Sequence, residues 1–187
     1  MARLAITLLG PFGATLDGEP LKTFKSHKVE ALLAYLAAEP HRPHPRSVLA
    51  DLLWPERTDR DARRNLSYAL TDLRDTIHDH DARPPFLRID RDALQLVWQS
   101  EVSVDALEVL ACVGVDRPTQ AGPSDLQRAV ALYRGPFLEG FSVNSAPFEE
   151  WLAVKREQYA RLALGALRRL GEFLQQDGIS PDEVFRS

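Results

Sequence analysis

Apolar residues recur at helical spacing over residues 58–79, TDRDARRNLSYALTDLRDTIHD, and predict an amphipathic helix there. Thr58 and Asp61 stand just before the pattern, in an arrangement typical of a capping box that fixes the helix start. The residues predicted to face the core are Ala62, Leu66, Ala69, Leu70, Leu73 and Ile77. The opposite side is polar and basic, with Arg60, Arg64, Tyr68 and Thr71 at its centre and Arg63, Ser67 and Arg74 on its flanks.

The N-terminal residues predict a small antiparallel sheet. Apolar runs at residues 3–9, 12–16 and 21–24 have the length of short strands, and Gly10-Pro11 separates the first two. Asp17-Gly18 is a hairpin-turn dipeptide. We therefore expect three strands before the first helix.

Two shorter helices are predicted between this sheet and residue 58. The first follows a candidate N-cap at Ser26 and ends at Pro40; the second begins near Pro45 and ends at Trp54-Pro55. Residues 41–45 (HRPHP) between them predict a stiff loop. The apolar positions of the two helices are Val29, Leu32, Leu33, Leu36 and Ala37, then Val48, Leu49, Leu52 and Leu53.

Two short apolar runs, at residues 86–90 and 94–98, follow the third helix. Leu94, Leu96 and Trp98 alternate with polar residues, which is typical of a half-buried hairpin strand. Three strands, three helices and a closing hairpin, in this order, predict a winged helix. In that fold the third helix enters the major groove of DNA and the hairpin forms the wing.

The second half of the chain predicts helices at residues 104–113, 125–133 and 147–176, with a loop at 116–124 and an apolar turn at 134–141. The inward positions of the long helix are Phe148, Trp151, Leu152, Tyr159, Leu162, Leu167, Leu170 and Phe173 or Leu174. Small residues at the helix crossings, Ala129, Ala163 and Ala166, indicate a tetratricopeptide-like array, although the strict repeat signature is absent.

The predicted fold class is therefore mainly α with small antiparallel sheets. Residues 1–100 form a winged-helix domain and residues 101–187 an α-helical, tetratricopeptide-like domain. A second capping box, Ser180-Pro-Asp-Glu183, starts a helix that has little room before Ser187. This predicts that the natural protein continues.

Composition supports a globular protein, with 44% hydrophobic and 27% charged residues. No apolar run approaches the roughly 18 residues of a membrane span. The one cysteine, Cys112, excludes an internal disulfide and a multi-cysteine zinc site, and predicts a reducing cytoplasm. The net charge of −4 falls on the second half, since residues 1–100 carry 14 basic and 14 acidic side chains. A neutral module with one basic face can still bind DNA.

Nothing in the sequence supports enzymatic chemistry, a cofactor or a metal. There is no glycine-rich phosphate loop, and the adjacent Glu149-Glu150 point in different directions on a helix. His41 and His44 lack a carboxylate or thiol partner at suitable spacing, which favours a loop. The run at residues 78–81 (HDHD) is interpreted as a solvated, partly capping helix end.

Four stretches resemble a known family: residues 52–74 (LLWPERTDRDARRNLSYALTDLR), 84–97 (PPFLRIDRDALQLV), 131–141 (ALYRGPFLEGF) and 148–158 (FEEWLAVKREQ). They are similar to bacterial regulators that pair a response-regulator-type winged helix with a bacterial transcriptional activator domain, such as the antibiotic regulatory proteins and their large multidomain relatives. The resemblance implies a sequence-specific DNA-binding activator at promoter direct repeats. It also implies a helical domain that supports dimerisation and recruits RNA polymerase.

The residues expected to contact double-stranded DNA lie on three elements. Arginines of the third helix suit guanine or phosphate, its hydroxyls suit base edges, and the wing tip suits the minor groove. The start of the first helix, with Lys25, His27 and Lys28, suits the DNA backbone. The candidates are Arg60, Arg63, Arg64, Ser67, Tyr68, Thr71, Arg74, Arg91, Lys25 and Lys28.

Two aspartates depart from the family pattern at the end of the third helix. Asp72 replaces the first arginine of the family's R-L-R, Leu73 and Arg74 keep the rest, and Asp75 follows. Negative charge there repels phosphate, so we expect contacts in the N-terminal half of the helix. The same aspartates and the acidic second half favour an alternative, a helical interaction module whose winged helix docks protein instead of DNA.

Overall fold

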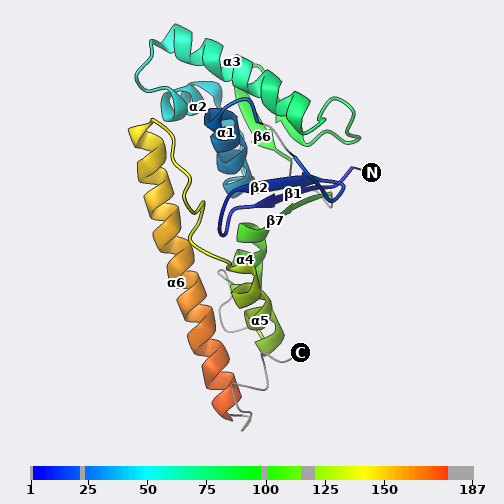
Figure 1. The fold of residues 1–187 in the computed structure, drawn as a ribbon, viewed down its shortest axis with the longest axis vertical. Coiled ribbons are helices and arrows are strands. Elements are labelled where there is room, and N and C mark those ends of the chain that lie inside the picture. The colour runs from blue at the N-terminus through cyan, green and yellow to red at the C-terminus, as the bar shows by residue number, and fades with distance from the viewer. Residues whose placement is uncertain (1, 22–23, 98–100, 115–120, 177–187) are drawn as a thin grey trace.

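The computed structural model describes residues 2–21, 24–97, 101–114 and 121–176. Helix α3 (Asp59–Thr76) lies across one end of the molecule, and α4 (Asp105–Val113) and α5 (Pro123–Leu132) lie towards the other (Figure 1). The long α6 (Ala146–Gln176) runs along one side of both parts. Helices cover about half of the chain and the sheets are small. This confirms the mainly α class.

The N-terminal sheet has the strand order β3-β2-β1-β7. Strands β1 (Leu4–Thr7) and β2 (Gly13–Leu16) pair antiparallel, and the turn at Asp17-Gly18 has positive φ at both residues, as a tight hairpin requires. The predicted third strand at residues 21–24 is wrong in its described part. Strand β3 (Glu19–Pro20) begins directly after the turn, because a two-residue turn places Leu16 opposite Glu19.

A fourth strand of this sheet comes from beyond residue 100. Strand β7 (Val102–Val104) pairs parallel with β1, so the sheet is mixed and not purely antiparallel. Three residues are too few for alternation to predict a strand. The helix expected from residue 104 consequently begins one residue later.

Three helices pack together at the end of the molecule where α3 lies. The predicted apolar faces of α1 (His27–Ala38) and α3 are buried, and Thr58 Oγ1 accepts a hydrogen bond from Asp61 N, as a helix cap should. Helix α2 (Arg46–Leu53) contacts both of them. Val48 of α2 is 47% exposed, so this apolar position of the helix lies on the surface of the protein.

The predicted hairpin forms strands β5 (Leu87–Ile89) and β6 (Ala93–Leu96), while Trp98 lies outside the described residues. The predicted loop at residues 41–45 contains a short strand instead, β4 (His44–Pro45), which pairs with β6. His44 is buried and its Nε2 lies 2.7 Å from Glu39 O. Tertiary pairing therefore overrides the loop composition.

The helices of the second half begin and end within two residues of the predicted positions. Leu167 is 45% exposed and its predicted inward position is wrong, because the buried stripe of α6 passes through Tyr159, Ala163, Ala166 and Leu170. The predicted loop falls largely on residues 115–120 and the predicted C-terminal helix on residues 177–187, all outside the described part. Among the described residues, no helix has both the length and the apolar composition to cross a membrane.

The apolar turn at residues 134–141 joins the two parts of the molecule. Leu138 N donates to Leu8 O at 2.7 Å and Gly10 N to Pro136 O at 3.1 Å, so the turn pairs with the residues that directly follow β1. Phe137 is fully buried and stacks on Tyr159 at a centroid distance of 5.2 Å. Burial of this turn against both parts makes them one packed unit.

An ion pair between α1 and α6 supports this contact. Lys155 Nζ lies 2.7 Å from Glu39 Oε1, and Trp151 Nε1 donates to the same oxygen at 3.5 Å. Burial opposes ionisation of Glu39, but the hydrogen bonds and charges of Lys155, Trp151 and Arg42 outweigh it and lower the pKa of Glu39.

Replacing Glu39 by Gln should therefore destabilise the fold in a pH-dependent way. Since the folded pKa lies below the ordinary value of 4.5, the stabilisation is present above that pH and is lost as pH falls through the folded pKa. We expect Glu39→Gln to lower Tm by about 2–4 °C at pH 7 and by less at acid pH. Thermal unfolding at several pH values measures this, with Glu150→Gln on the exposed side of α6 as control. An equal Tm difference at every pH would contradict it.

Candidate nucleic-acid interface

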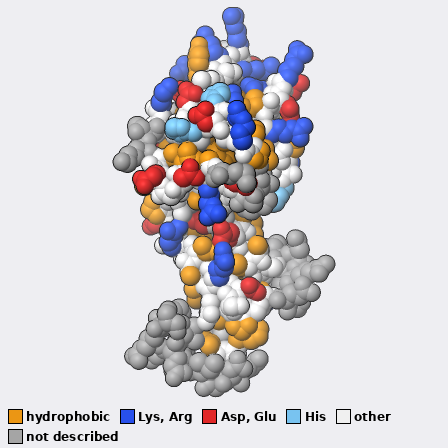
Figure 2. All heavy atoms as spheres, turned by 90° about the vertical axis from the view of Figure 1, so that its right-hand side faces the viewer, with side chains coloured by type: hydrophobic (Ala, Val, Ile, Leu, Met, Phe, Trp, Pro, Cys, Tyr) orange, Lys and Arg blue, Asp and Glu red, His pale blue; other side chains and the backbone are white. Residues whose placement is uncertain are grey.

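The outer face of α3 presents most of the predicted contact residues together. The cap at Thr58 fixes the helix start, and the buried stripe fixes its rotation about its own axis. All six outward candidates of the first four turns are exposed: Arg60, Arg63, Arg64, Ser67, Tyr68 and Thr71. Tyr68 is 64% exposed, which is unusual for a large ring without a partner. Basic side chains are densest over this end of the molecule (Figure 2).

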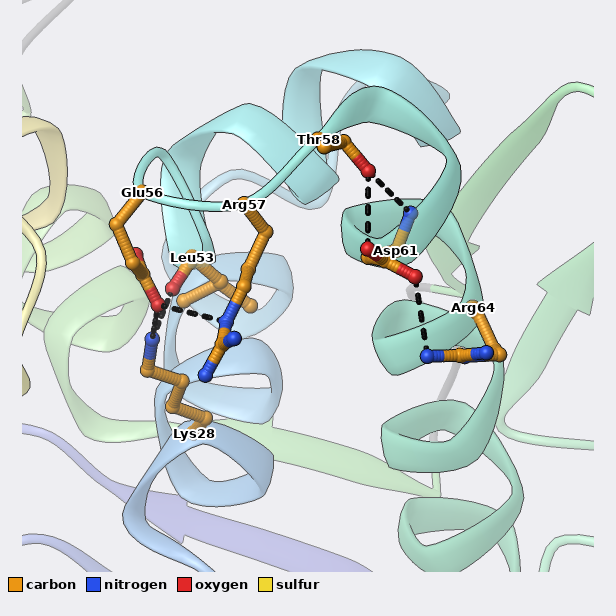
Figure 3. A network of polar contacts seen from close by, with 7 residues as sticks. All are labelled: Lys28, Leu53, Glu56, Arg57, Thr58, Asp61 and Arg64. Atoms are coloured by element: carbon orange, nitrogen blue, oxygen red, sulfur yellow. Dashed lines mark hydrogen bonds and ion pairs between the residues drawn. The ribbon is translucent and has the colours of Figure 1, made fainter.

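The arginines of this face differ in whether their guanidinium groups have an ion-pair partner. Arg64 Nη2 lies 3.0 Å from Asp61 Oδ1, the carboxylate that also accepts from the capping Thr58 (Figure 3). Both partners are largely exposed, so this pair is weak and readily exchanged for a phosphate. Arg60 and Arg63 have no side-chain partner among the described residues. They present free guanidinium groups to solvent.

The hydroxyl groups of α3 are oriented by the helix itself. Ser67 Oγ donates to Arg63 O at 3.0 Å and Thr71 Oγ1 donates to Ser67 O at 3.1 Å. Their protons are therefore used within the helix. The remaining lone pairs face outward as acceptors, which suits the amino groups of bases in the major groove.

A groove separates α3 from the β5–β6 turn and the start of α2. Arg63 and Ser67 line one wall, and Arg91, at the tip of the turn, lines the other. Arg46 is hydrogen-bonded to the β5–β6 turn and so lies on the same wall as Arg91. Arg46 N donates to Asp92 O at 2.9 Å and Arg46 Nε donates to Asp90 O at 3.3 Å. The full lining is Pro45, Arg46, Ser47, Arg63, Leu66, Ser67, Arg91 and Asp92.

Arg46 and Ser47 belong to this groove but were not among the predicted contacts. The sequence gives only a weak signal for them, since a basic residue and a hydroxyl at a helix start are common. Their place beside Arg63 depends on the pairing of β4 with β6, which the loop composition did not predict. The groove gathers three arginines from three elements.

Lys28, a predicted backbone contact, is engaged within the protein. Its Nζ donates to Leu53 O at 2.5 Å and lies 3.5 Å from Glu56 Oε1 (Figure 3). The same Nζ lies 5.4 Å from the centre of the Trp54 ring. Its side chain is 19% exposed. These contacts hold the turn between α2 and α3 and leave little of the ammonium group for a ligand.

Arg74 is likewise engaged. Its Nε lies 3.1 Å from Asp79 Oδ2, and the other oxygen of that buried carboxylate accepts from Leu87 N at 2.9 Å. This arrangement ties the end of α3 to strand β5. The interpretation of residues 78–81 as a solvated helix end is therefore wrong for Asp79, which is buried because Arg74 and Leu87 N bind its carboxylate. The described residues contain no cluster of three side chains able to hold a metal ion.

Lys25 and Asp72 neutralise each other. Lys25 Nζ lies 2.5 Å from Asp72 Oδ1, and the hydrogen bond and charge of Asp72, with a smaller effect of Asp75, raise the pKa of Lys25. Lys25 is exposed and Asp72 is half-buried. The aspartate expected to repel phosphate therefore carries a compensating ammonium group.

One solved structure has a similar fold over almost the whole chain. It is that of Mycobacterium tuberculosis EmbR in complex with a low-affinity phosphopeptide, with a TM-score of 0.75 and 23% sequence identity. The match covers 95% of this chain and 47% of the EmbR chain, so this chain spans about half of that protein's length. No family model matches the sequence, and no curated protein matches it. The likeness shows a shared fold.

The partners of Arg74 lead to a prediction about stability. Arg74→Ala leaves the buried Asp79 without its cation, so we expect a loss of about 1–3 kcal/mol in the free energy of unfolding. Arg60 belongs to the same helix, is exposed and has no side-chain partner among the described residues. Arg60→Ala should therefore change the free energy of unfolding by less than about 0.5 kcal/mol. Urea unfolding at pH 7 compares the two. Equal stabilities of the two variants would show that the Arg74–Asp79 contact contributes nothing.

Proposed function

We propose that this protein is a sequence-specific DNA-binding transcriptional regulator, with a winged-helix domain followed by a helical domain of the tetratricopeptide type. The observation that carries the proposal is the groove between α3 and the β5–β6 turn, where Arg46, Arg63 and Arg91 converge beside the exposed face of α3. The similar fold of EmbR and the resemblance of four sequence stretches to bacterial activators support it.

In this proposal α3 enters the major groove. Arg60 and Arg63 supply donors for guanine or phosphate, while Ser67 and Thr71 supply acceptors. Arg64 exchanges Asp61 for DNA. The phosphates of one strand pass along the groove between α3 and the wing, where Arg46 and Arg91 face them from the side opposite Arg63.

The second half of the chain acts in transcription activation. Its helices do not share the basic end of the molecule, and its charge is net acidic, with 9 basic and 13 acidic residues beyond Ser100. Such a surface suits protein partners better than DNA. We propose that it contacts RNA polymerase and a second copy of the protein at direct repeats. We also propose a cytoplasmic location and no enzymatic activity.

Salt dependence distinguishes this proposal from a winged helix that docks protein. A protein that neutralises several phosphates loses affinity steeply as salt rises, because condensed counterions are released on binding. A docking module that binds protein has no such constraint. We expect the groove arginines Arg46, Arg63 and Arg91 to determine how steeply the affinity for DNA falls with salt concentration.

Two variants test the roles of the arginines. Arg63→Ala should cost about 1–3 kcal/mol with a selected DNA duplex and relax its sequence preference. Arg91→Ala should weaken binding to all duplexes alike and reduce the salt slope by about one phosphate contact. Fluorescence anisotropy over a salt series measures both, with the exposed Arg161→Ala of α6 as a control that leaves binding unchanged. If both groove variants bound DNA with wild-type affinity and wild-type salt dependence, the groove would be excluded as the DNA site.

A further inference from the structure

Ser145 connects the start of α6 to the end of α2. Its buried hydroxyl donates to Leu52 O at 2.5 Å and accepts from Phe148 N at 3.4 Å, so a single Oγ serves two helices that are 93 residues apart in sequence. The backbone of Ser145 also accepts from Glu149 N, as the N-cap of a helix does. Helix α6 begins beside α2 (Figure 1).

The contact satisfies carbonyl groups that the end of α2 leaves without partners. The last carbonyls of a helix lack intrahelical donors and carry partial negative charge. In α2 two of them receive side-chain donors, Leu52 O from Ser145 and Leu53 O from Lys28. The N-terminus of α6, with partial positive charge, therefore lies against the C-terminus of α2. The two helix dipoles attract each other.

Only a short turn separates the C-terminus of α2 from α3, the proposed DNA-reading helix. Residues 54–58 lead from α2 to α3, and Trp54 at their start is buried under the ammonium group of Lys28. Arg57 N donates to Trp54 O at 3.1 Å, which keeps the turn compact. A shift at Leu52 is consequently carried into the first two turns of α3, where Arg60 and Arg63 lie.

We infer that Ser145 is a positioning residue for DNA recognition: its hydroxyl sets where the first turns of α3 lie relative to the helical half of the molecule. The inference rests on the proposed function for its consequence, since α3 reads DNA only in that proposal. Ser145 itself is buried and touches no ligand. It acts through Leu52 and the turn that follows.

Two substitutions separate positioning from helix capping. Ser145→Ala removes both the cap and the bond to Leu52 O. Ser145→Gly removes the same bond, but glycine is tolerated at an N-cap almost as well as serine. Ser142→Ala is the matched control. Ser142 lies in the same loop as Ser145, and its Oγ donates to Glu149 of α6 and does not contact α2. Ser145→Thr keeps the hydroxyl and tests rescue.

The direct test is the distance between α3 and α6 in the full chain, measured by electron–electron double resonance. Spin labels at Asp59→Cys and Leu164→Cys, both exposed, are placed in a Cys112→Ala background. We expect Ser145→Ala and Ser145→Gly to broaden or shift the distance distribution, and Ser142→Ala and Ser145→Thr to leave it unchanged. If one of the first two variants does not fold, as judged by circular dichroism, the other decides. A folded variant with the wild-type distribution overturns the inference.

DNA binding supplies the functional readout. A duplex selected by the wild-type protein from a random pool and its scrambled counterpart are titrated with each variant. Loss of positioning should weaken binding to the selected duplex about 3–10-fold and leave the scrambled duplex unchanged, since only base contacts need the register. Equal weakening on both duplexes would contradict positioning. If the wild-type protein prefers neither duplex, the proposed function fails, whereas the distance measurement still decides the inference about Ser145.

Discussion

Burial of the apolar stripe of α3 against α1 and α2 is the constraint on which the rest of the structure depends. Ala62, Leu66, Ala69, Leu70 and Leu73 are all nearly or fully buried, and this fixes which side of the helix faces out. Asp59 and Asp61 in the first turn suit the helix dipole and offset the arginines beside them. Because an isolated helix of this length is only marginally stable in water, α3 depends mainly on this packing and on the cap at Thr58. The basic outer face is a consequence of the apolar inner one.

The same packing explains why the two halves of the chain form one unit. The turn at residues 134–141 is hydrogen-bonded to residues 8–10, directly after β1, and its buried Phe137 connects it to the inner face of α6. The pair of Glu39 and Lys155 and the hydroxyl of Ser145 then join α6 to α1 and α2. These polar contacts lie on the elements that support α3, so the helical half has a physical route to the proposed DNA-facing end.

Local patterns in the sequence were sufficient for the long elements. Period and capping predicted α3 and its buried face, because a sustained apolar stripe has few other solutions. They were insufficient where pairing between distant segments determines the structure. Strands β4 and β7 are examples, as are the groove residues Arg46 and Ser47. They also did not reveal that Lys28 and Arg74 are engaged by Leu53 and Asp79, since a charged side chain with a partner looks the same in sequence as one without.

We propose that the face of α3 and the adjoining groove read DNA. The most direct measurement is selection of fragments from a random DNA pool by the purified protein at two salt concentrations, about 50 and 200 mM. We expect an enriched sequence at the lower salt and a loss of affinity of several orders of magnitude between the two salt concentrations. Absence of enrichment at both concentrations would contradict it and favour a module that docks protein.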